Sequence, residues 1–296
     1  MVVFYRRMPG FDYLKPESLE EALEILNDND GGRYRVYAGG TDLMPKIKKR
    51  SIDAPEAVID LKGISGLDYV RYSEGEGLVI GALASVASVA SSEIVREKYT
   101  ALAQGAANIA STHIQNRGTI AGNICSAVPS ADSAPALMVL GAEVICVSRG
   151  GERRLAIADF FVGPGQTSLK PSEVVKEIRI PAPSPDMRGV YLKLATREKM
   201  DLAIVGVAVT GALRGDRLED VRIGLGAVAP TPIRASQAEA ELDGKSLDAR
   251  LMGKASKTAS LESKPIDDHR ASAEYRRMMV EVLVNRGLQH LAAQAG

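Results

Sequence analysis

The 296-residue sequence has no tryptophan and only two cysteines, Cys125 and Cys146. Two cysteines cannot build the disulfide framework of a small secreted scaffold, and they are too few to supply the four ligands of an iron–sulfur cluster. No apolar run reaches membrane-spanning length, and the N-terminus lacks the apolar core of a signal peptide. We therefore expect a cytoplasmic protein with no membrane span and no cluster of its own.

Neither sign of charge is in excess, since 37 Lys and Arg residues face 37 Asp and Glu residues. This balance gives no indication of nucleic acid as a partner. The histidines, His113, His269 and His290, lie far apart and form no zinc spacing with the cysteines. Nucleophile-elbow and kinase signatures are also missing. We expect no resident metal and no catalytic acid, base or nucleophile.

Two glycine clusters are the strongest positive signals. A predicted strand at 34–38 runs into Gly39–Leu43, and Gly118 and Gly122 bracket a second cluster that continues to Asn123. Glycine lets a backbone come close to a ligand, and the free N–H groups at the start of a helix attract anions. Neither cluster is a Walker loop or a G-x-G-x-x-G fingerprint, but two such loops can clasp one diphosphate. The alternative is a pair of buried loops that only close a sheet.

Four ordered segments resemble one protein family. A-G-G-T-D-L at 38–43 and T-I-A-G-N-I-C-S-A-V-P-S-A-D-S-A-P at 119–135 resemble the flavin-binding motifs of the FAD subunits of molybdenum hydroxylases, the xanthine dehydrogenase and carbon monoxide dehydrogenase type. Ala121 stands where this family usually has glycine. Residues 191–203 resemble the family's strand near the flavin ring, and residues 265–277 resemble the signature of its C-terminal domain. Four matches in order are far more specific than any one of them.

This resemblance implies FAD as a non-covalent cofactor. It places the backbone of both glycine clusters at the diphosphate, Asp132 at the ribose or ribityl chain, Lys193 at the isoalloxazine edge, Tyr191 over the ring and Leu169 in the pocket. The implied cofactor-binding residues are Ala38, Gly39, Gly40, Thr41, Asp42, Leu43, Thr119, Ile120, Ala121, Gly122, Asn123, Asp132, Leu169, Tyr191 and Lys193.

The resemblance also implies a place in an enzyme complex. In such a complex a large molybdenum–pterin subunit hydroxylates the substrate. Electrons then pass through [2Fe–2S] clusters of a small subunit to FAD in a chain like this one, and on to an external acceptor. We expect these two subunits as partners, arranged as a dimer of heterotrimers. The alternatives are a self-contained flavin-dependent reductase or oxidase on the same fold, and a cofactor-free interaction subunit.

Three further features keep two interpretations each. Cys125, beside the second cluster, suits a buried apolar residue better than a nucleophile. His113 lies near a flavin or is satisfied by local hydrogen bonds. The basic run Lys46–Arg50 forms a solvated helix face or helps to neutralise a diphosphate.

We expect an α+β protein with two domains. Residues 1–180 form a two-part FAD-binding α/β domain, with subdomains at about 1–61 and 62–180. The proline-rich segment 181–185 is the linker, because alternating prolines continue neither helix nor sheet. Residues 186–296 form a three-stranded antiparallel sheet with helices on one face. The expected helices are 19–26, 46–50, 101–110, one from 132, 235–242, 249–260 and 270–293; the expected strands are 34–38, 58–61, 77–82, 143–148, 173–180, 190–196, 203–213 and 221–228.

Overall fold

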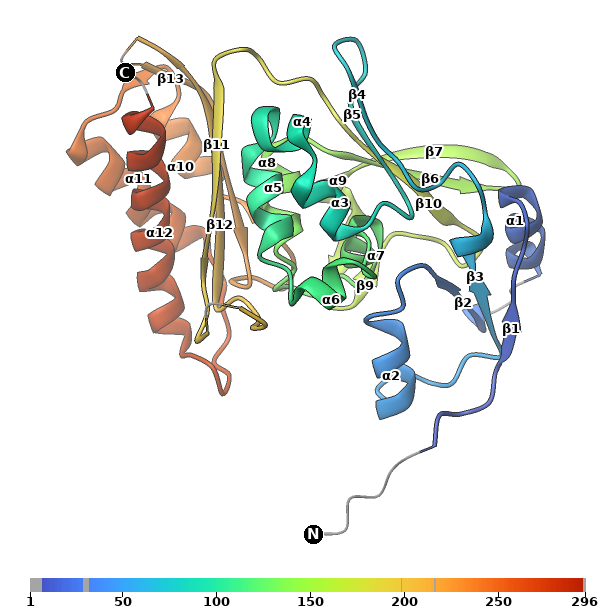
Figure 1. The fold of residues 1–296 in the computed structure, drawn as a ribbon. Helices are drawn as coiled ribbons and strands as arrows, with labels where there is room; N and C mark the ends of the chain where they lie inside the picture. The colour runs from blue at the N-terminus through green and yellow to red at the C-terminus, as the bar shows by residue number, and fades with distance from the viewer. Residues whose placement is uncertain (1–6, 29–31, 198, 216, 295–296) are drawn as a thin grey trace.

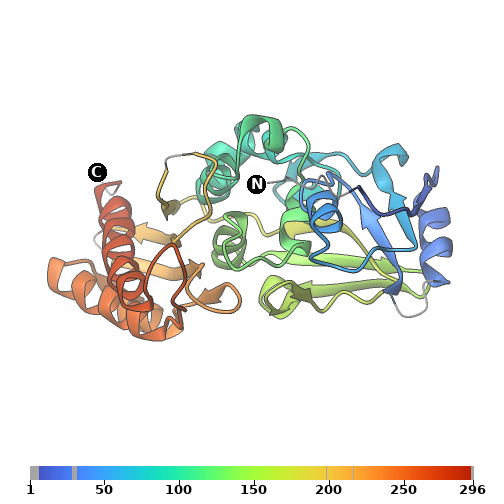
Figure 2. The same ribbon diagram turned by 90° about the horizontal axis from the view of Figure 1, so that it is seen from below.

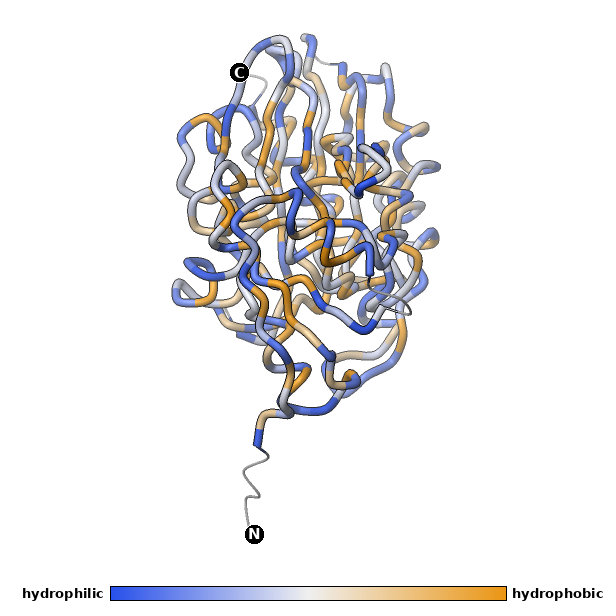
Figure 3. The backbone as a smooth tube through the Cα atoms, turned by 90° about the vertical axis from the view of Figure 1, so that its right-hand side faces the viewer, coloured by the Kyte–Doolittle hydropathy of each residue, from blue (hydrophilic) through white to orange (hydrophobic). Residues whose placement is uncertain are grey.

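The computed structural model describes residues 7–28, 32–197, 199–215 and 217–294. Three parts lie in a row: a small N-terminal unit, a central sheet with its helices, and a C-terminal sheet with its helices (Figures 1 and 2). Within the described ranges, no helix is long and apolar enough to span a membrane. Figure 3 shows hydrophobic and hydrophilic stretches alternating along the chain.

The N-terminal unit is a three-stranded parallel sheet with the order β1-β3-β2. Ser18 caps the first helix, since its Oγ accepts the Glu21 N–H at 3.1 Å, and the Glu21 carboxylate accepts the Glu17 N–H at 2.7 Å. The apolar face of that helix, with Ala22, Leu23 and Leu26 buried, packs on the sheet and defines the smallest of the cores. The elements are β1 (Asp12–Leu14), α1 (Leu19–Asn27), β2 (Tyr34–Tyr37), α2 (Leu43–Lys49), β3 (Ala57–Asp60) and the 3-10 turn η2 (Leu61–Gly63).

The central part is a five-stranded antiparallel sheet with the order β4-β5-β10-β6-β7, covered by short helices. Its strands are β4 (Val70–Ser73), β5 (Gly77–Gly81), β6 (Glu143–Ser148), β7 (Gly151–Ala156) and β10 (Val174–Ile180), with a small hairpin of β8 (Phe161–Gly163) and β9 (Gln166–Thr167). Its helices are α3 (Val86–Ser91), α4 (Glu93–Lys98), α5 (Thr100–Ala107), α6 (Thr112–Gln115), α7 (Ile120–Cys125), α8 (Ser133–Val139) and α9 (Ile157–Phe160).

The C-terminal sheet confirms the α+β fold class and extends it. The predicted strands are β11 (Met187–Leu194), β12 (Val205–Arg214) and β13 (Arg217–Gly226), in consecutive antiparallel pairing. Two more strands, β14 (Ile233–Arg234) and β15 (Lys245–Ser246), pair with β13, so the expected three-stranded sheet is too small. Both have only two residues, which is too short for an alternating pattern to reveal them. The helices are α10 (Ser236–Leu242), α11 (Ala249–Glu262) and α12 (Ala273–Ala293).

Both faces of this C-terminal sheet are covered. Helices α10, α11 and α12 pack on the outer face, while α5 and α8 of the central part pack on the inner face (Figure 1). Glycines on the strands make the inner contact close: a Cβ at Gly224 would lie 2.5 Å from the Pro135 carbonyl oxygen of α8, and a Cβ at Gly226 would lie 2.7 Å from Pro135 Cγ. The two sheet systems therefore share α8 as a common wall.

Candidate cofactor site

The first glycine loop, between β2 and α2, has a shape that the protein itself requires. A Cβ at Gly39 would lie 2.1 Å from the Arg117 carbonyl oxygen, and a Cβ at Gly40 would lie 2.1 Å from the Tyr37 ring. Gly40 also has φ +72°, which L side chains rarely adopt. Glycine is therefore needed at both positions so that the loop can pack on the Tyr37 ring and on the backbone before α7. The sequence suggested glycine here for a different reason, the close approach of a ligand.

The Tyr37 ring, which lies against Gly40, is fixed by a contact with Lys62. The Lys62 ammonium lies 3.6 Å from the centroid of the ring. The same ammonium pairs with the buried Asp60 carboxylate at 2.7 Å. The loop therefore rests on a fixed aromatic surface.

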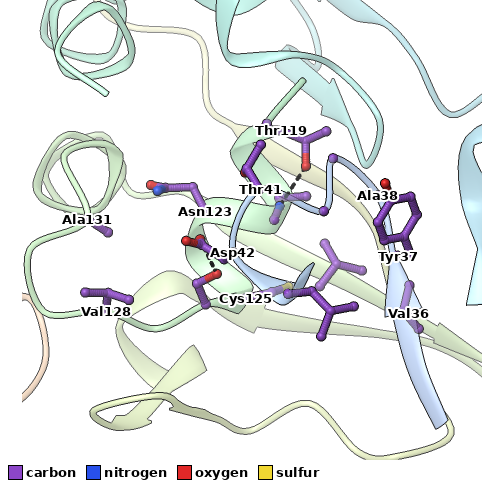
Figure 4. A pocket seen from close by; sticks show the side chains of 18 of the residues that line it. Val36, Tyr37, Ala38, Thr41, Asp42, Thr119, Asn123, Cys125, Val128 and Ala131 are labelled. Atoms are coloured by element: carbon purple, nitrogen blue, oxygen red, sulfur yellow. Dashed lines mark hydrogen bonds between the residues drawn. The ribbon is translucent and has the colours of Figure 1, made fainter. Parts of the chain in front are cut away.

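The second cluster is a helix, α7, and not the open glycine turn that its sequence suggests. Thr119 is its N-cap, and its Oγ1 accepts the Gly122 N–H at 2.9 Å. The hydroxyl of Thr119 is thus occupied by the helix. Asn123 turns its Oδ1 to the Ser133 hydroxyl at 2.6 Å. The Ser126 hydroxyl donates to Asp42 Oδ2 at 2.7 Å and so ties the two loops together (Figure 4).

Between these loops lies a cavity of about 810 Å³, within the range of sites that enclose a large organic ligand. Its lining includes all of the predicted cofactor residues except Ile120, Tyr191 and Lys193. Ile120 is fully buried in the core. Figure 4 shows Thr41 and Asp42 of the first loop beside Thr119 and Asn123 of the second. The chain thus brings two segments 80 residues apart to one cavity.

Asp132, the residue expected at the ribose or ribityl chain, lies in the cavity lining at the start of α8. It precedes α8, but its side chain makes no capping hydrogen bond. Instead, Asp132 Oδ1 accepts the Tyr191 hydroxyl at 2.7 Å and Oδ2 accepts the Lys193 ammonium at 2.9 Å. Burial raises the pKa of the Asp132 carboxyl, although Lys193 and Tyr191 act in the opposite direction. Burial, together with the Asp132 charge, also raises the pKa of Tyr191 well above its ordinary value.

Tyr191 and Lys193 therefore lie behind the cavity wall. Lys193 Nζ donates to the Asn108 carbonyl at 3.1 Å and to the Asp201 carbonyl at 2.8 Å, in addition to Asp132. Its side chain is 7% exposed. Lys193 was expected to place its charge at the edge of a flavin ring. In this structure the charge is buried and paired, because three oxygens of the protein accept hydrogen bonds from the ammonium.

Every carboxylate in the cavity lining has a donor. Besides Asp132 and Asp42, Glu173 accepts the Arg153 guanidinium at 2.6 Å, and Asp201 accepts the Leu202 N–H at 3.0 Å. Burial acts to raise the pKa of Glu173, but hydrogen bonds from Arg153 and the Lys170 backbone hold it below its ordinary value. No histidine belongs to the lining formed by the described residues. Each carboxylate of the described lining is thus held in place by a hydrogen bond or ion pair with the protein.

The two remaining candidates are now placed. Cys125, the last residue of α7, lines the cavity, and burial raises the pKa of its thiol to about 12. The thiol stays protonated at neutral pH, so the structure favours the apolar interpretation. His113 is exposed on α6 and does not line the cavity. Lys46 of the basic run lines the cavity, whereas Lys48, Lys49 and Arg50 are exposed.

The structure adds a segment that the sequence motifs did not indicate. Residues 109–111 line the cavity next to residues 200–202, which lie within the family-like segment 191–203, and the Met200 N–H donates to the Ala110 carbonyl at 3.3 Å. Met200 and Ala110 have positive φ, 60° and 45°, which is uncommon outside glycine. Leu26, from α1, and Tyr37 also line the cavity. Residues 109–111 and Leu26 carry no glycine or charge pattern that would have revealed them.

Two sequence profiles match the chain. The profile described as the FAD binding domain in molybdopterin dehydrogenase matches residues 9–183, and that of the CO dehydrogenase flavoprotein C-terminal domain matches residues 190–291. The chain belongs to the FAD-binding medium subunits of the molybdenum hydroxylases. The family resemblance of the motifs is thereby confirmed.

Individual medium subunits resemble the chain over nearly its whole length. It is 34% identical to the glyceraldehyde dehydrogenase medium chain of Sulfolobus acidocaldarius, covering 96% of this chain and 99% of that one. It is 33% identical to the carbon monoxide dehydrogenase medium chain of Afipia carboxidovorans, with 97% and 99% covered. The structure of carbon monoxide dehydrogenase from Hydrogenophaga pseudoflava superposes with a TM-score of 0.91 at 34% identity, covering 96% of this chain and 97% of that one.

The residues present fit the cofactor of this family. Among the described residues, the backbone N–H groups of Gly39, Gly40 and Thr41 donate to no oxygen of the protein. Such unpaired donors beside a cavity suit the oxygens of a diphosphate. FAD is therefore the cofactor of this chain, as the description of the matched family model states.

Proposed function

We propose that this chain holds FAD non-covalently in the cavity between the two loops and acts as an electron-transfer subunit. The observation that carries the proposal is the cavity itself, which two separate glycine segments and the C-terminal domain line together. FAD, when bound, supplies the redox chemistry: it takes up electrons from the [2Fe–2S] clusters of a small subunit and passes them to an external acceptor.

The chain's own groups bind and orient this cofactor. We assign the diphosphate to the backbone of Ala38–Leu43 and Thr119–Asn123, with the half-buried Lys46 as an added positive charge. Because α2 and α7 are short, we assign the hydrogen bonds to the diphosphate to the unpaired N–H groups of Gly39, Gly40 and Thr41 and not to a helix dipole. Asp132 accepts hydrogen bonds from ribose or ribityl hydroxyls, and Leu169 contributes an apolar wall.

The partners follow from the same assignment. We propose a small iron–sulfur subunit and a large molybdenum–pterin subunit, assembled with this chain as a dimer of heterotrimers in the cytoplasm. Two observations support the division of labour: every carboxylate of the cavity lining already has a donor, and the described residues contain no cluster of three or more metal-binding side chains. Hydroxylation of an organic substrate is therefore assigned to the large subunit.

Three measurements on the purified chain test this proposal. Acid precipitation should release a yellow supernatant, whereas colour that stays with the pellet would mean covalent attachment. Dithionite should reduce the bound flavin, and an external acceptor should reoxidise it. Purines, aldehydes and aromatic acyl thioesters should leave the flavin oxidised until the two partner subunits are added. Rapid bleaching by such a substrate, with this chain alone in the cuvette, would instead identify a self-contained flavoenzyme.

A further inference from the structure

Lys193 stands where three segments of the cavity wall meet. Its ammonium donates to Asp132 at the start of α8, to the Asn108 carbonyl at the end of α5, and to the Asp201 carbonyl in the segment after β11. An ammonium has three N–H donors, and these three oxygens use all of them. Asp132 and Asp201 line the cavity, but Lys193 does not.

The strand that carries Lys193 is also fixed in register on α5. The Tyr191 N–H donates to Gln104 Oε1 at 2.8 Å, so a side chain of α5 accepts a hydrogen bond from the unpaired edge of β11. The Tyr191 hydroxyl then reaches Asp132 Oδ1. Lys193 and Tyr191 thus hold the two carboxylate oxygens from the same strand, and the C-terminal domain sets the position of a side chain in the central part.

The Asp132 carboxylate retains capacity on its cavity side. Each of its oxygens accepts one hydrogen bond from the protein, and each has a further lone pair. A ligand in the cavity therefore meets a fixed double acceptor whose charge is balanced from behind by Lys193. The pair has no net charge.

We propose that Lys193 is a positioning residue: it holds Asp132 as a fixed acceptor for the cofactor and ties the 200–202 segment to α5, and it acts on the flavin only through these groups. This inference rests on the proposed function, since it takes FAD as the occupant of the cavity. It differs from direct contact between the ammonium and the flavin ring, and the two can be separated by experiment.

The test is a double-mutant cycle of Lys193→Met and Asp132→Asn, with the FAD dissociation constant and the midpoint potential of the bound flavin as readouts. Each single variant should weaken FAD binding about tenfold, and the double variant should also lose about tenfold, because two residues that act along one path are not additive. The midpoint potential of the double variant should equal that of the wild type, because a neutral pair is replaced by two neutral groups.

Lys176→Met is the matched control. Lys176 also lies on a strand and pairs with a carboxylate, Glu152, at 3.7 Å, but it does not line the cavity. Its FAD affinity should stay within about twofold of the wild type, as expected for an exposed ion pair. If Lys193→Met fails to fold because Asp132 is left unpaired, the double variant and Asp132→Asn still report both readouts, since neither leaves a buried carboxylate without its cation.

Two results would overturn the inference. One is a loss of about a hundredfold in the double variant, which is the additive value expected of two independent contacts. The other is a midpoint potential of the double variant well below that of the wild type, which would show that the lysine charge itself stabilises the reduced flavin. Failure of the wild type to bind FAD would instead contradict the proposed function, so the two failures are distinguishable.

Discussion

Two ion pairs, one in the cavity wall and one in the C-terminal domain, each join an aspartate to a buried cation, but the pKa values of the two aspartates shift in opposite directions. Asp132 pairs with Lys193 beside the cavity, and Asp268 pairs with Arg276 between α11 and α12. Both cations also donate to backbone carbonyls; Arg276 donates to those of Ile204 at 2.8 Å and Ala227 at 3.1 Å. Yet the pKa of Asp132 is raised and the pKa of Asp268 is lowered.

The difference follows from the number of donors and the depth of burial. Asp268 accepts the Arg270 guanidinium at 2.6 Å and the N–H groups of Arg270 and Ala271, besides Arg276 at 2.7 Å. The Arg270 hydrogen bond is the largest of the effects that hold its pKa down, and its side chain is 17% exposed. Asp132 has two donors and a side chain that is 7% exposed, so desolvation dominates. A neighbouring cation does not by itself decide the protonation of a carboxyl group.

The consequence is a division between a structural pair and a pair beside a ligand site. Asp268 has its acceptor capacity filled by the protein and locks the α11–α12 connection to β12 and β13. Asp132 keeps lone pairs that face the cavity. This difference between the two ion pairs can be tested by mutation and by varying the pH.

Arg276→Met should give the largest loss of stability. It removes one of the donors of Asp268 and the guanidinium hydrogen bonds to the Ile204 and Ala227 carbonyls, and each acceptor left without its hydrogen bond inside the protein costs about 1–3 kcal/mol. Urea unfolding should show this loss, with FAD affinity unchanged wherever the protein remains folded. Arg277→Met, at the exposed neighbouring position, is the control and should be nearly neutral. Equal effects at the two positions would remove the structural role of the pair.

Gly40→Ala should weaken FAD binding about a hundredfold and should also lower the stability of the folded chain. The new Cβ meets the Tyr37 ring, and a left-handed φ adds about 1–2 kcal/mol for an alanine. Titration with FAD measures the effect. Adding Tyr37→Ala should recover part of the affinity by removing the clash. Gly75→Ala, where a Cβ would have nothing within 4 Å, is the control and should bind FAD normally. If Gly40→Ala binds FAD with normal affinity, the first glycine loop does not contribute to FAD binding.

The pH dependence of stability should have opposite sign at the two aspartates. For Asp268 the folded pKa lies below the ordinary 3.8, so its contribution is present above that pH and is lost as the pH falls below it. For Asp132 the folded pKa lies above 3.8, so its contribution is present below that pH and is lost as the pH rises through the folded value.

Urea unfolding between pH 3 and pH 7 checks these signs. The stability of the wild type minus that of Asp268→Asn should grow with pH, and the stability of the wild type minus that of Asp132→Asn should shrink with pH. Two slopes of the same sign would mean that the two pairs do not differ in the way described.

Tyr191→Phe should have the smallest effect. It removes one donor to Asp132 Oδ1 and leaves the Lys193 pair intact, so we expect a loss of about 1–2 kcal/mol in stability, the usual size for a hydrogen bond to a charged group. Thermal unfolding measures it. Tyr275→Phe, at an exposed position of α12, serves as the control. A loss as large as that of Arg276→Met would show that the cavity pair is as structural as the other one.

Much of this architecture could be predicted from local patterns. Ser18 and Ser85 each stand just before a helix, and both accept the N–H three residues later. The long strands and helices alternate or repeat strongly enough to be found, although α5 ends at Ala107 and not at 110. Most of the residues that the family motifs indicated line the cavity. Short-range hydrogen bonding and hydrophobic period are properties of neighbouring residues, so a single sequence carries them.

The family, the two glycine segments, the helix caps and the long helices and strands can therefore be predicted from the sequence. Which polar groups remain free depends on the tertiary structure. Asp132 makes no capping hydrogen bond to α8, and the Thr119 hydroxyl caps α7. The Lys193 ammonium donates to three oxygens from other segments. The physical reason is that a buried polar group must find a partner, and that partner is chosen by proximity in space. For Lys193 the partners lie 85, 61 and 8 residues away, beyond the reach of any local pattern.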